Sequence, residues 1–228
     1  MSGVREPDWA HWLKQWDRQQ QNSFPAREER FNSILDVLGA RMRRKFTVLD
    51  LGCGPGSLSL RGLRRFPKAR FIGVDADPVM LKLGRESVGS VGGRMRWVSA
   101  DIRRSDWVTK LPVRRVDAAI STNALHWLPP PKLRRLYRDI HALLLPRGVF
   151  LNGDWLTSKD EGPTSNICSI GSIGSAANGF TSPRCGWTGA AGGGSWNVSP
   201  RWRTSSQCEG RSSRGVTLAN PISRSRTT

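Results

Sequence analysis

Between residues 46 and 151 the chain alternates between short apolar runs and longer stretches whose apolar side chains recur at helical spacing. The short runs are rich in branched and aromatic residues and are bounded by turn residues, which predicts buried strands. Parallel strands need a crossover connection, and a helix after each strand supplies it. The alternation therefore predicts an α/β fold, a Rossmann-like, doubly wound and mainly parallel sheet with helices on both faces. The predicted strands cover residues 46–51, 71–74, 95–100, 116–121 and 149–151.

Helix start and stop signals lie between these strands. Asp77 is a predicted N-cap and Pro78 takes the first helical position after it. Apolar residues at helical spacing predict another helix over residues 58–66. The strongest amphipathic pattern begins at Pro130 and stops at the Pro-Arg-Gly sequence of residues 146–148.

Residues 1–40 are predicted to form an N-terminal helical cap. One helix of the cap follows Pro7-Asp8, and the other ends near Gly39. The first carries three tryptophans at helical spacing, which we interpret as a core-facing stripe: Trp9, Trp12 and Trp16. The second repeats the spacing of one buried helix face with Phe31, Ile34, Leu35 and Leu38.

The composition changes near residue 158. Residues 1–160 hold 20 leucines, whereas residues 161–228 hold one. Only 8 of the last 68 residues are Leu, Ile, Val or Phe, below the roughly 20% that a packed core requires. We therefore expect a core over residues 41–157 and a low-complexity tail over residues 158–228. The tail is either a disordered extension or the product of a shifted reading frame, and in neither case does it supply the last strands of the sheet.

The formal net charge of +18 favours contact with nucleic acid, although no basic stripe interleaved with aromatic residues supports it. Paired arginines are most simply solvated faces; otherwise they would steer an acidic substrate or an RNA backbone. These pairs stand at residues 64–65, 103–104, 114–115 and 134–135.

The four cysteines form no CxxC pair, and no histidine stands near them at the sequence spacing of metal ligands. Neither a metal site nor a disulfide framework is therefore predicted. The sequence has no run of 18 apolar residues, so no membrane span is predicted. The start of the sequence lacks the apolar core of a secretory signal, and the expected location is the cytoplasm.

Acidic residues stand at the ends of the first three predicted strands. Asp50 ends the first strand, Asp75 the second and Asp101 the third. A turn with glycines at 52, 54 and 56 follows Asp50, and such a turn lets the backbone approach a ligand closely. Asp75 stands where a carboxylate can accept hydrogen bonds from ribose hydroxyls, and Asp101 could accept from a purine amine. Together they predict a pocket for an adenosine-bearing cofactor.

The spacing of the turn disfavours a dinucleotide. The third glycine of a G-x-G-x-x-G turn is replaced by Ser57, and Asp50 would repel a pyrophosphate. A cofactor with a cationic centre tolerates Asp50 well, and S-adenosylmethionine is such a cofactor. NAD is the weaker alternative.

These residues resemble the class I S-adenosylmethionine-dependent methyltransferases. The segment VLDLGCGPGSLSL is similar to the first motif of that family, FIGVDADPVML to the second and WVSADI to the third. VDAAISTNALHWLPP resembles the fourth, and its NALHWLP run is similar to the small-molecule branch that contains trans-aconitate methyltransferase. The resemblance covers roughly residues 25–155.

The resemblance implies a role for each matching residue. The methionine portion of the cofactor would lie against Asp50, Gly52, Cys53, Gly54 and Gly56. The adenosine would be held by Asp75 and Ala76 at the ribose and by Asp101 and Ile102 at the adenine. The methyl group and the acceptor would face Ser121, Asn123 and His126. The N-terminal segment of the family also covers the pocket, which makes Trp16 and Gln20 candidates.

The implied activity is methyl transfer from S-adenosylmethionine to a small-molecule acceptor by in-line displacement. His126 is the candidate base for an acceptor that must lose a proton; the alternative is a packed or capping histidine beside Trp127. No Asn-Pro-Pro-Tyr-like element follows the fourth strand, which disfavours a base or amide nitrogen acceptor. Two alternatives stay open: a catalytically impaired cofactor-binding protein that lacks the last strands, and an RNA or protein methyltransferase that uses the basic surface.

Overall fold

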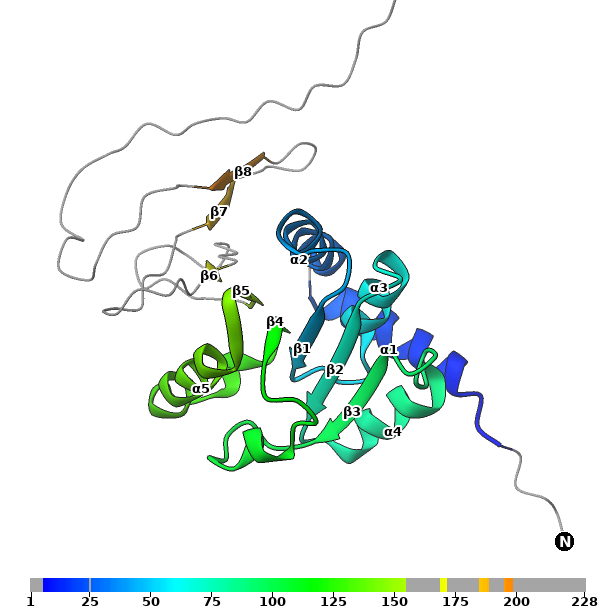
Figure 1. The fold of residues 1–228 in the computed structure, drawn as a ribbon. Helices are drawn as coiled ribbons and strands as arrows, with labels where there is room; N and C mark the ends of the chain where they lie inside the picture. The colour runs from blue at the N-terminus through cyan, green and yellow to red at the C-terminus, as the bar shows by residue number, and fades with distance from the viewer. Residues whose placement is uncertain (1–5, 25, 155–168, 172–184, 189–194, 199–228) are drawn as a thin grey trace, which may run out of the picture.

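The computed structural model describes residues 6–24, 26–154, 169–171, 185–188 and 195–198. Between residues 47 and 153, strands alternate with helices and form one sheet covered by helices (Figure 1). The helices are α1 Trp9–Ser23, α2 Arg27–Arg41, α3 Ser57–Arg65, α4 Pro78–Ser87 and α5 Pro130–Leu143, with short 3-10 turns η1 Trp107–Lys110 and η2 Leu125–Trp127. The strands are β1 Thr47–Leu51, β2 Arg70–Asp75, β3 Met95–Ser99, β4 Val116–Thr122, β5 Leu144–Gly153, β6 Ser169–Gly171, β7 Cys185–Thr188 and β8 Ser195–Val198.

The sheet confirms the predicted doubly wound architecture. Its strand order is β3-β2-β1-β4-β5-β6, and the first five strands are parallel to their neighbours. The order reverses between β1 and β4, so β1 has parallel neighbours on both sides. In the register, Asp50 of β1 lies opposite Gly73 of β2 and Ile120 of β4.

Alternate residues of the strands feed two separate apolar layers. Leu49 and Ala119 belong to the layer that α5 covers, whereas Val48 and Ala118 belong to the layer under α2 and α3. This alternation follows from the period of two in a strand, which sends successive side chains to opposite faces. Because both faces are covered, the strands of the centre are apolar almost throughout.

The predicted start of α4 agrees with the structure, whereas the predicted end of α5 lies a few residues too late. Asp77 caps α4 by accepting hydrogen bonds from the backbone N–H groups of Val79 and Met80. Helix α5 ends at Leu143 and β5 begins at once, earlier than the predicted strand at 149–151. The register shifts between Leu144 and Val149, and Arg147 adopts a positive φ of 69° there. The Pro-Arg-Gly sequence therefore forms an irregularity inside β5.

The two N-terminal helices differ in how well their patterns predict burial. Phe31 and Ile34 of α2 are buried with the rest of the predicted face. In α1 the interpretation of a core-facing tryptophan stripe is wrong, because Leu13 is the buried residue of this helix and Trp12 is 56% exposed. Trp9 and Trp16 are half-buried on the same face as Leu13, whereas Trp12 lies off that face, and α1 packs beside α4.

Three short segments of the predicted tail form strands. Strand β6 pairs antiparallel with β5, opposite Phe150–Asn152, and β7 pairs antiparallel with β8 as a separate two-stranded sheet. The sequence did not predict these strands, because each has only three or four residues. The other residues of the tail from 158 on, and with them the prediction of disorder, lie outside the described residues.

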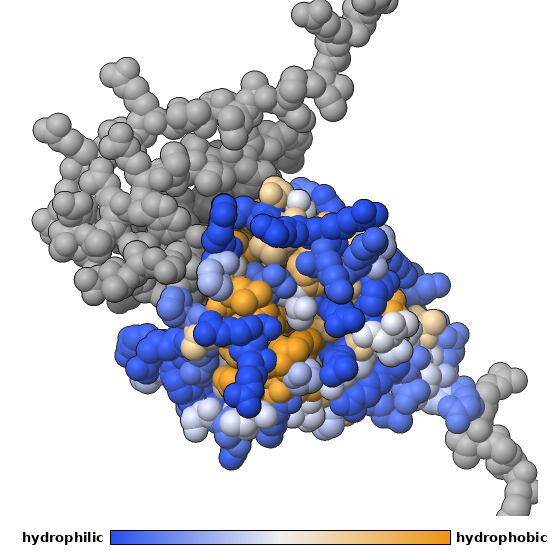
Figure 2. All heavy atoms as spheres, viewed as in Figure 1, coloured by the Kyte–Doolittle hydropathy of each residue, from blue (hydrophilic) through white to orange (hydrophobic). Residues whose placement is uncertain are grey.

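Charged and polar residues dominate the face of the molecule seen in Figure 2, with apolar residues gathered near its centre. Each arginine pair has at least one solvent-exposed member, as predicted for solvated faces. The exposed members include Arg64, Arg104, Arg114 and Arg134. Within the part of the chain that the structure describes, no helix has the length and apolar character needed to cross a membrane.

Candidate functional site

The glycine turn of residues 52–56 lies at the carboxyl end of β1, where the strand order reverses. In open α/β sheets ligands bind beyond this edge, at the reversal point. The turn is anchored to the neighbouring strand, because the backbone N–H groups of Gly52 and Cys53 both donate to the carbonyl of Val74. The turn and the ends of β2, β3 and β4 thus form one contiguous edge.

Backbone conformation explains why the turn needs glycine. Gly52, Gly54 and Gly56 have positive φ angles of 65°, 54° and 82°. Residues with a Cβ adopt this region at a cost of roughly 1–2 kcal/mol. The three left-handed residues bend the chain sharply, and the turn leads directly into helix α3.

The surroundings of the three glycines differ. A Cβ at Gly52 would lie 2.4 Å from the Cβ of Ala124, so this glycine lets the segment after β4 approach the turn. A Cβ at Gly56 would lie 2.5 Å from the ring of Trp97. At Gly54 the nearest atom would be Cζ2 of Trp16, 4.0 Å away. The turn is therefore packed at both ends and open at its middle residue.

Asp50 is buried at the end of β1, 2% exposed, and accepts a hydrogen bond from the hydroxyl of Ser59 at 2.6 Å. Burial raises the pKa of Asp50 to about 7; the Ser59 hydrogen bond lowers it, and the charge of Asp75 raises it. The prediction that Asp50 lies against the cofactor stays a prediction. A cation placed near this carboxyl would favour its ionised form.

Asp75 ends β2 and reaches back to the glycine turn. Its Oδ2 accepts the backbone N–H of Gly54 at 2.7 Å, and its Oδ1 accepts the backbone N–H of Asp77 at 2.9 Å. The carboxylate therefore joins the open part of the turn to the start of α4. The adjoining Ala76 is exposed, which leaves this corner accessible.

Asp101 follows β3 and is held by Arg103. The Arg103 Nε lies 2.9 Å from Asp101 Oδ1, and the backbone N–H of Arg103 donates to the same atom at 2.8 Å. These hydrogen bonds lower the pKa of Asp101, so the carboxylate stays charged. The next residue, Ile102, is buried in the layer under α5.

At the end of β4, the side chain of Ser121 is hydrogen-bonded, whereas a buried side-chain oxygen of Asn123 is not. Ser121 is fully buried and donates to the carbonyl of Leu51 at 2.8 Å, so its hydroxyl joins β4 to β1. Asn123 adopts a positive φ of 51°, and among the described residues its buried Oδ1 has no hydrogen-bond partner. A strained backbone with an orphaned buried oxygen is typical of a position that contacts a ligand.

His126 follows in η2 and is held by Asp154 at the end of β5. The imidazole Nδ1 lies 2.6 Å from Asp154 Oδ1, and the backbone N–H of His126 donates to Asp154 Oδ2 at 2.9 Å. The Asp154 side chain is 1% exposed, whereas the His126 side chain is 27% exposed. The ring of Trp127 lies beside the imidazole, with 4.8 Å between the ring centroids.

The cysteine of the turn faces away from this edge. Cys53 is buried beside Gly73, where a Cβ would lie 2.8 Å from its sulfur. Burial raises the pKa of the Cys53 thiol well above its usual range, which disfavours the reactive thiolate. The backbone of Cys53 serves the turn itself, because its N–H group donates to Val74 and its carbonyl accepts from Gly56.

Helix α1 is fastened to the site by a polar contact. Asp17 accepts the hydroxyl of Ser57 at 2.6 Å, at the start of α3, and also pairs with the buried Arg27 at 3.0 Å. These contacts bring Trp16 to the open side of Gly54. Gln20 is half-buried on the same helix.

Sequence reasoning did not find Asp154. It identified an acid at the end of each of the first three strands and stopped there, although the fifth strand also ends in an acid, in the sequence Leu-Asn-Gly-Asp of residues 151–154. The same rule extended to β5 would have found it. Ser59, which bonds Asp50, carried no such signal because it is one of two serines in its helix.

Comparison with known proteins agrees with this geometry. The family model of the methyltransferase domain matches residues 48–148, from β1 into β5. A solved structure, CalS10 bound to S-adenosylmethionine, an amino pentose methyltransferase from Micromonospora echinaspora, covers 87% of this chain and 78% of its own, with a TM-score of 0.52 and 19% identity. At that identity the likeness shows the shared fold.

Two curated relatives are trans-aconitate 2-methyltransferases. The protein of Azoarcus sp. (strain BH72) is 34% identical over 156 residues, which cover 65% of this chain and 57% of that protein. The protein of Escherichia coli (strain K12 / DH10B) is 34% identical over 112 residues, 48% of this chain and 40% of that protein. The chain thus matches about half the length of these relatives. Residues 48–148 thus match a methyltransferase domain, and both of these relatives, which align with this chain, are methyltransferases by name.

Proposed function

We propose that this protein transfers a methyl group from S-adenosylmethionine to a small-molecule acceptor. The observation that carries the proposal is the junction between Asp75 and Gly54, where the acid at the end of β2 bonds the open residue of the glycine turn. A carboxylate in this position leaves lone pairs for ribose hydroxyls beside a backbone that a ligand can approach.

The residues present fit a cofactor with a positive centre. Asp50 is buried near Asp75 without a basic partner among the described residues, and burial raises its pKa to about 7. A cationic ligand in the turn would compensate the charge that this carboxyl carries when ionised. At Gly54 the nearest atom to an added Cβ is Cζ2 of Trp16, 4.0 Å away, and the orphaned Oδ1 of Asn123 offers an acceptor just after β4.

In this proposal S-adenosylmethionine would supply the methyl group, and its sulfonium sulfur would leave as the neutral thioether of S-adenosylhomocysteine. The protein holds the acceptor atom in line with the methyl group and excludes water, which supplies much of the acceleration in such transfers. Trp16 of α1 closes the open side of Gly54, and the Asp17 contact to Ser57 keeps that helix in place.

His126 is the proposed group that faces the acceptor. Asp154 holds Nδ1, so Nε2 remains for a proton of the acceptor or for a hydrogen bond to it. An alcohol or phenol would need this base, and a carboxylate would need the imidazole only for orientation. The relatives methylate trans-aconitate according to their names, which makes a small carboxylic acid the first acceptor class to test. The cytoplasmic location stays a prediction.

A transfer assay with S-adenosylmethionine labelled in the methyl group tests the proposal. The acceptors are trans-aconitate, a panel of other small acids and alcohols, bulk tRNA and a protein mixture. We expect label in one class of small molecule and none after Asp75→Ala. Label in tRNA or protein alone would replace the small-molecule proposal, and cofactor binding without transfer to any acceptor would identify an inactive cofactor-binding protein.

A further inference from the structure

A cavity lies at the opposite edge of the sheet from the glycine turn. Its lining comes from the end of α2, the segment before β1 and the segment before β2, and its volume is about 390 Å³. Strand β1 has five residues, so the cavity lies roughly 17 Å from the glycine turn along the strand. The volume is within the range of small-molecule pockets, roughly 300–1,000 Å³. Nothing in the proposed methyl transfer uses this cavity.

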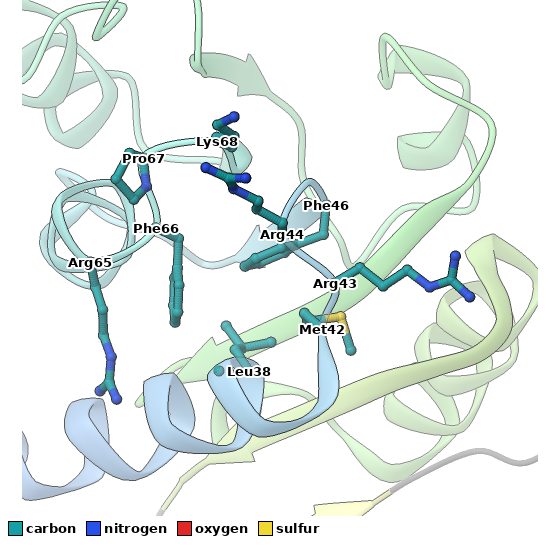
Figure 3. A pocket seen from close by; sticks show the side chains of 10 residues that line it. Leu38, Met42, Arg43, Arg44, Phe46, Arg65, Phe66, Pro67 and Lys68 are labelled. Atoms are coloured by element: carbon teal, nitrogen blue, oxygen red, sulfur yellow. The ribbon is translucent and has the colours of Figure 1, made fainter.

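The floor of the cavity is apolar. Leu38 and Phe46 are buried beneath it, and Met42 and Phe66 are half-buried at its sides. The rings of Phe46 and Phe66 meet edge to face, with 5.3 Å between their centroids, which fixes the position of both. Figure 3 shows these side chains around one hollow. An apolar group that entered it would leave water at a favourable free energy.

The rim of the cavity is basic. Arg44 and Lys68 come from the two segments that flank the hollow, and Figure 3 shows them on the same side of it. Both are exposed, and neither has a carboxylate within 4.0 Å among the described residues. Arg65 is different, because it pairs with Asp36 at 2.6 Å and lies over the ring of Phe66. Two uncompensated cations therefore stand on one side of the apolar floor. Arg43, a third cation of the lining without a carboxylate within 4.0 Å among the described residues, points away from them in Figure 3.

The positive charge extends beyond this cavity. An adjoining hollow of about 580 Å³ shares Met42 and Arg43 with it and is also lined by Arg41 and Arg147. Asp117 is the acid of that lining, and it already accepts the backbone N–H of Thr47 at 2.8 Å. A low-dielectric hollow edged by charges of one sign concentrates ions of the other sign.

We propose that the cavity bounded by Leu38, Phe46, Phe66, Arg44 and Lys68 binds a small organic anion with an apolar body and a phosphate or carboxylate head. The apolar body lies against the two phenylalanines, and the head lies between the guanidinium of Arg44 and the ammonium of Lys68. The site is separate from the methyl-transfer site at the other edge of the sheet. A nucleic acid backbone has no apolar body for the floor beneath the two phenylalanines, which favours a small anion with an apolar body as the occupant.

Calorimetric titration of the full chain with matched probes tests this site. Octyl phosphate has both required parts, octanol lacks the charge and inorganic phosphate lacks the apolar body. We expect one site for octyl phosphate with an affinity at least about tenfold above that for either partial probe. Nonanoate in place of octyl phosphate distinguishes a carboxylate head from a phosphate head. Affinity for octyl phosphate no greater than for inorganic phosphate or octanol would overturn the proposal.

Variants locate the binding. Arg44→Gln/Lys68→Gln should weaken octyl phosphate binding at least about tenfold, whereas Arg134→Gln/Arg138→Gln removes the same charge from exposed positions of α5 and should leave it unchanged. A Cβ at Gly39 would lie 3.6 Å from the ring of Phe66, so Gly39→Leu should fill the hollow and abolish binding. Circular dichroism and the melting temperature show that each variant folds, without reference to the methyl-transfer site.

Three results contradict the proposal. Equal weakening by both charge pairs would mean attraction to the net charge alone. Unchanged binding by Gly39→Leu would place the probe outside the hollow. Binding of single-stranded RNA that Arg44→Gln/Lys68→Gln abolishes, with none of octyl phosphate, would assign the surface to nucleic acid.

Discussion

Asp154 accepts two hydrogen bonds from His126, one from the imidazole Nδ1 and one from the backbone N–H, and so connects the end of β5 to the segment that follows β4. A carboxylate is an acceptor only, so the neutral ring carries its proton on Nδ1 and presents Nε2 as an acceptor. Burial raises the pKa of Tyr137, and the charge of Asp154 raises it further, which places the carboxylate near that phenol as well.

The tautomer of His126 tests this arrangement. We expect nitrogen-correlated NMR spectra at pH 7.5 to show the proton of neutral His126 on Nδ1. Asp154→Asn should leave a mixture of tautomers, because an amide can donate as well as accept. His11 and His141 are exposed on α1 and α5 and serve as internal references in the same spectra. A neutral wild-type ring protonated on Nε2 would contradict the assigned role of Asp154.

Asp75→Ala should raise the Kd for S-adenosylhomocysteine at least about thirtyfold, because it removes the ribose acceptor and the anchor of Gly54. The loss of the hydrogen bonds from Gly54 and Asp77 should also lower the free energy of unfolding by about 1–3 kcal/mol. Glu86→Ala, which removes an exposed acid of α4, is the control. Unchanged affinity in Asp75→Ala would contradict the ribose assignment.

The glycines of the turn should separate folding from binding. Gly54→Ala should cost about 1–2 kcal/mol for its positive φ and should also weaken S-adenosylhomocysteine binding. Gly92→Ala is the control, since it has a φ of 64° with no atom within 4 Å of the added Cβ. The two variants should lose similar stability in urea unfolding, and only Gly54→Ala should lose affinity. Equal affinities would mean that the middle of the turn does not face the cofactor.

Gly52→Ala should behave differently from both. Its Cβ would lie 2.4 Å from that of Ala124, so the segment after β4 must move. Overpacking of this kind adds about 1–3 kcal/mol to the cost of the positive φ. The free energy of unfolding should therefore fall further than in Gly92→Ala. A loss equal to that of Gly92→Ala would show that Ala124 does not pack against the turn.

The pH dependence of stability should report the buried carboxyl of Asp50. Burial raises its pKa from about 4 in the unfolded chain to about 7 in the folded chain. Below pH 4 the Asp50 carboxyl is protonated in both the folded and the unfolded chain, so its ionisation costs the folded chain no stability there. As the pH rises to 7 the unfolded chain ionises first, so the folded chain loses on the order of 4 kcal/mol at most.

Asp50→Asn removes this pH-dependent loss of stability, because the amide does not ionise. Urea unfolding at pH 4.5 and pH 7.5 should show the variant gaining stability relative to the wild type at the higher pH. Asp36→Asn, at an exposed position of α2, controls for the loss of an acid. A difference between wild type and Asp50→Asn that is the same at both pH values would contradict the raised pKa.

The core of the fold could be predicted because its signals are local. A period of two in the strands, the Asp77 cap and the glycines of the turn each act within a few residues. The tryptophans of α1 were misplaced because helical spacing says which residues share a face but not what that face meets. The early start of β5 depends on pairing with β4, which is a contact between distant segments.

The site was predicted in part for the same reason. The acids after the first three strands follow from strand ends and spacing, whereas partner choice does not. That Ser121 bonds Leu51 and that Ser59 bonds Asp50 depends on three-dimensional packing. The cavity under Phe46 and Phe66 joins three separate segments and left no signal in the sequence.

Calorimetric titration of the full chain with S-adenosylhomocysteine, with NADH as the comparison and circular dichroism as the check on folding, tests the central claim most directly. We expect one site for S-adenosylhomocysteine, no measurable heat with NADH, and loss of the site in Asp75→Ala. A folded chain that binds NADH in preference, or that does not bind S-adenosylhomocysteine, would contradict the account.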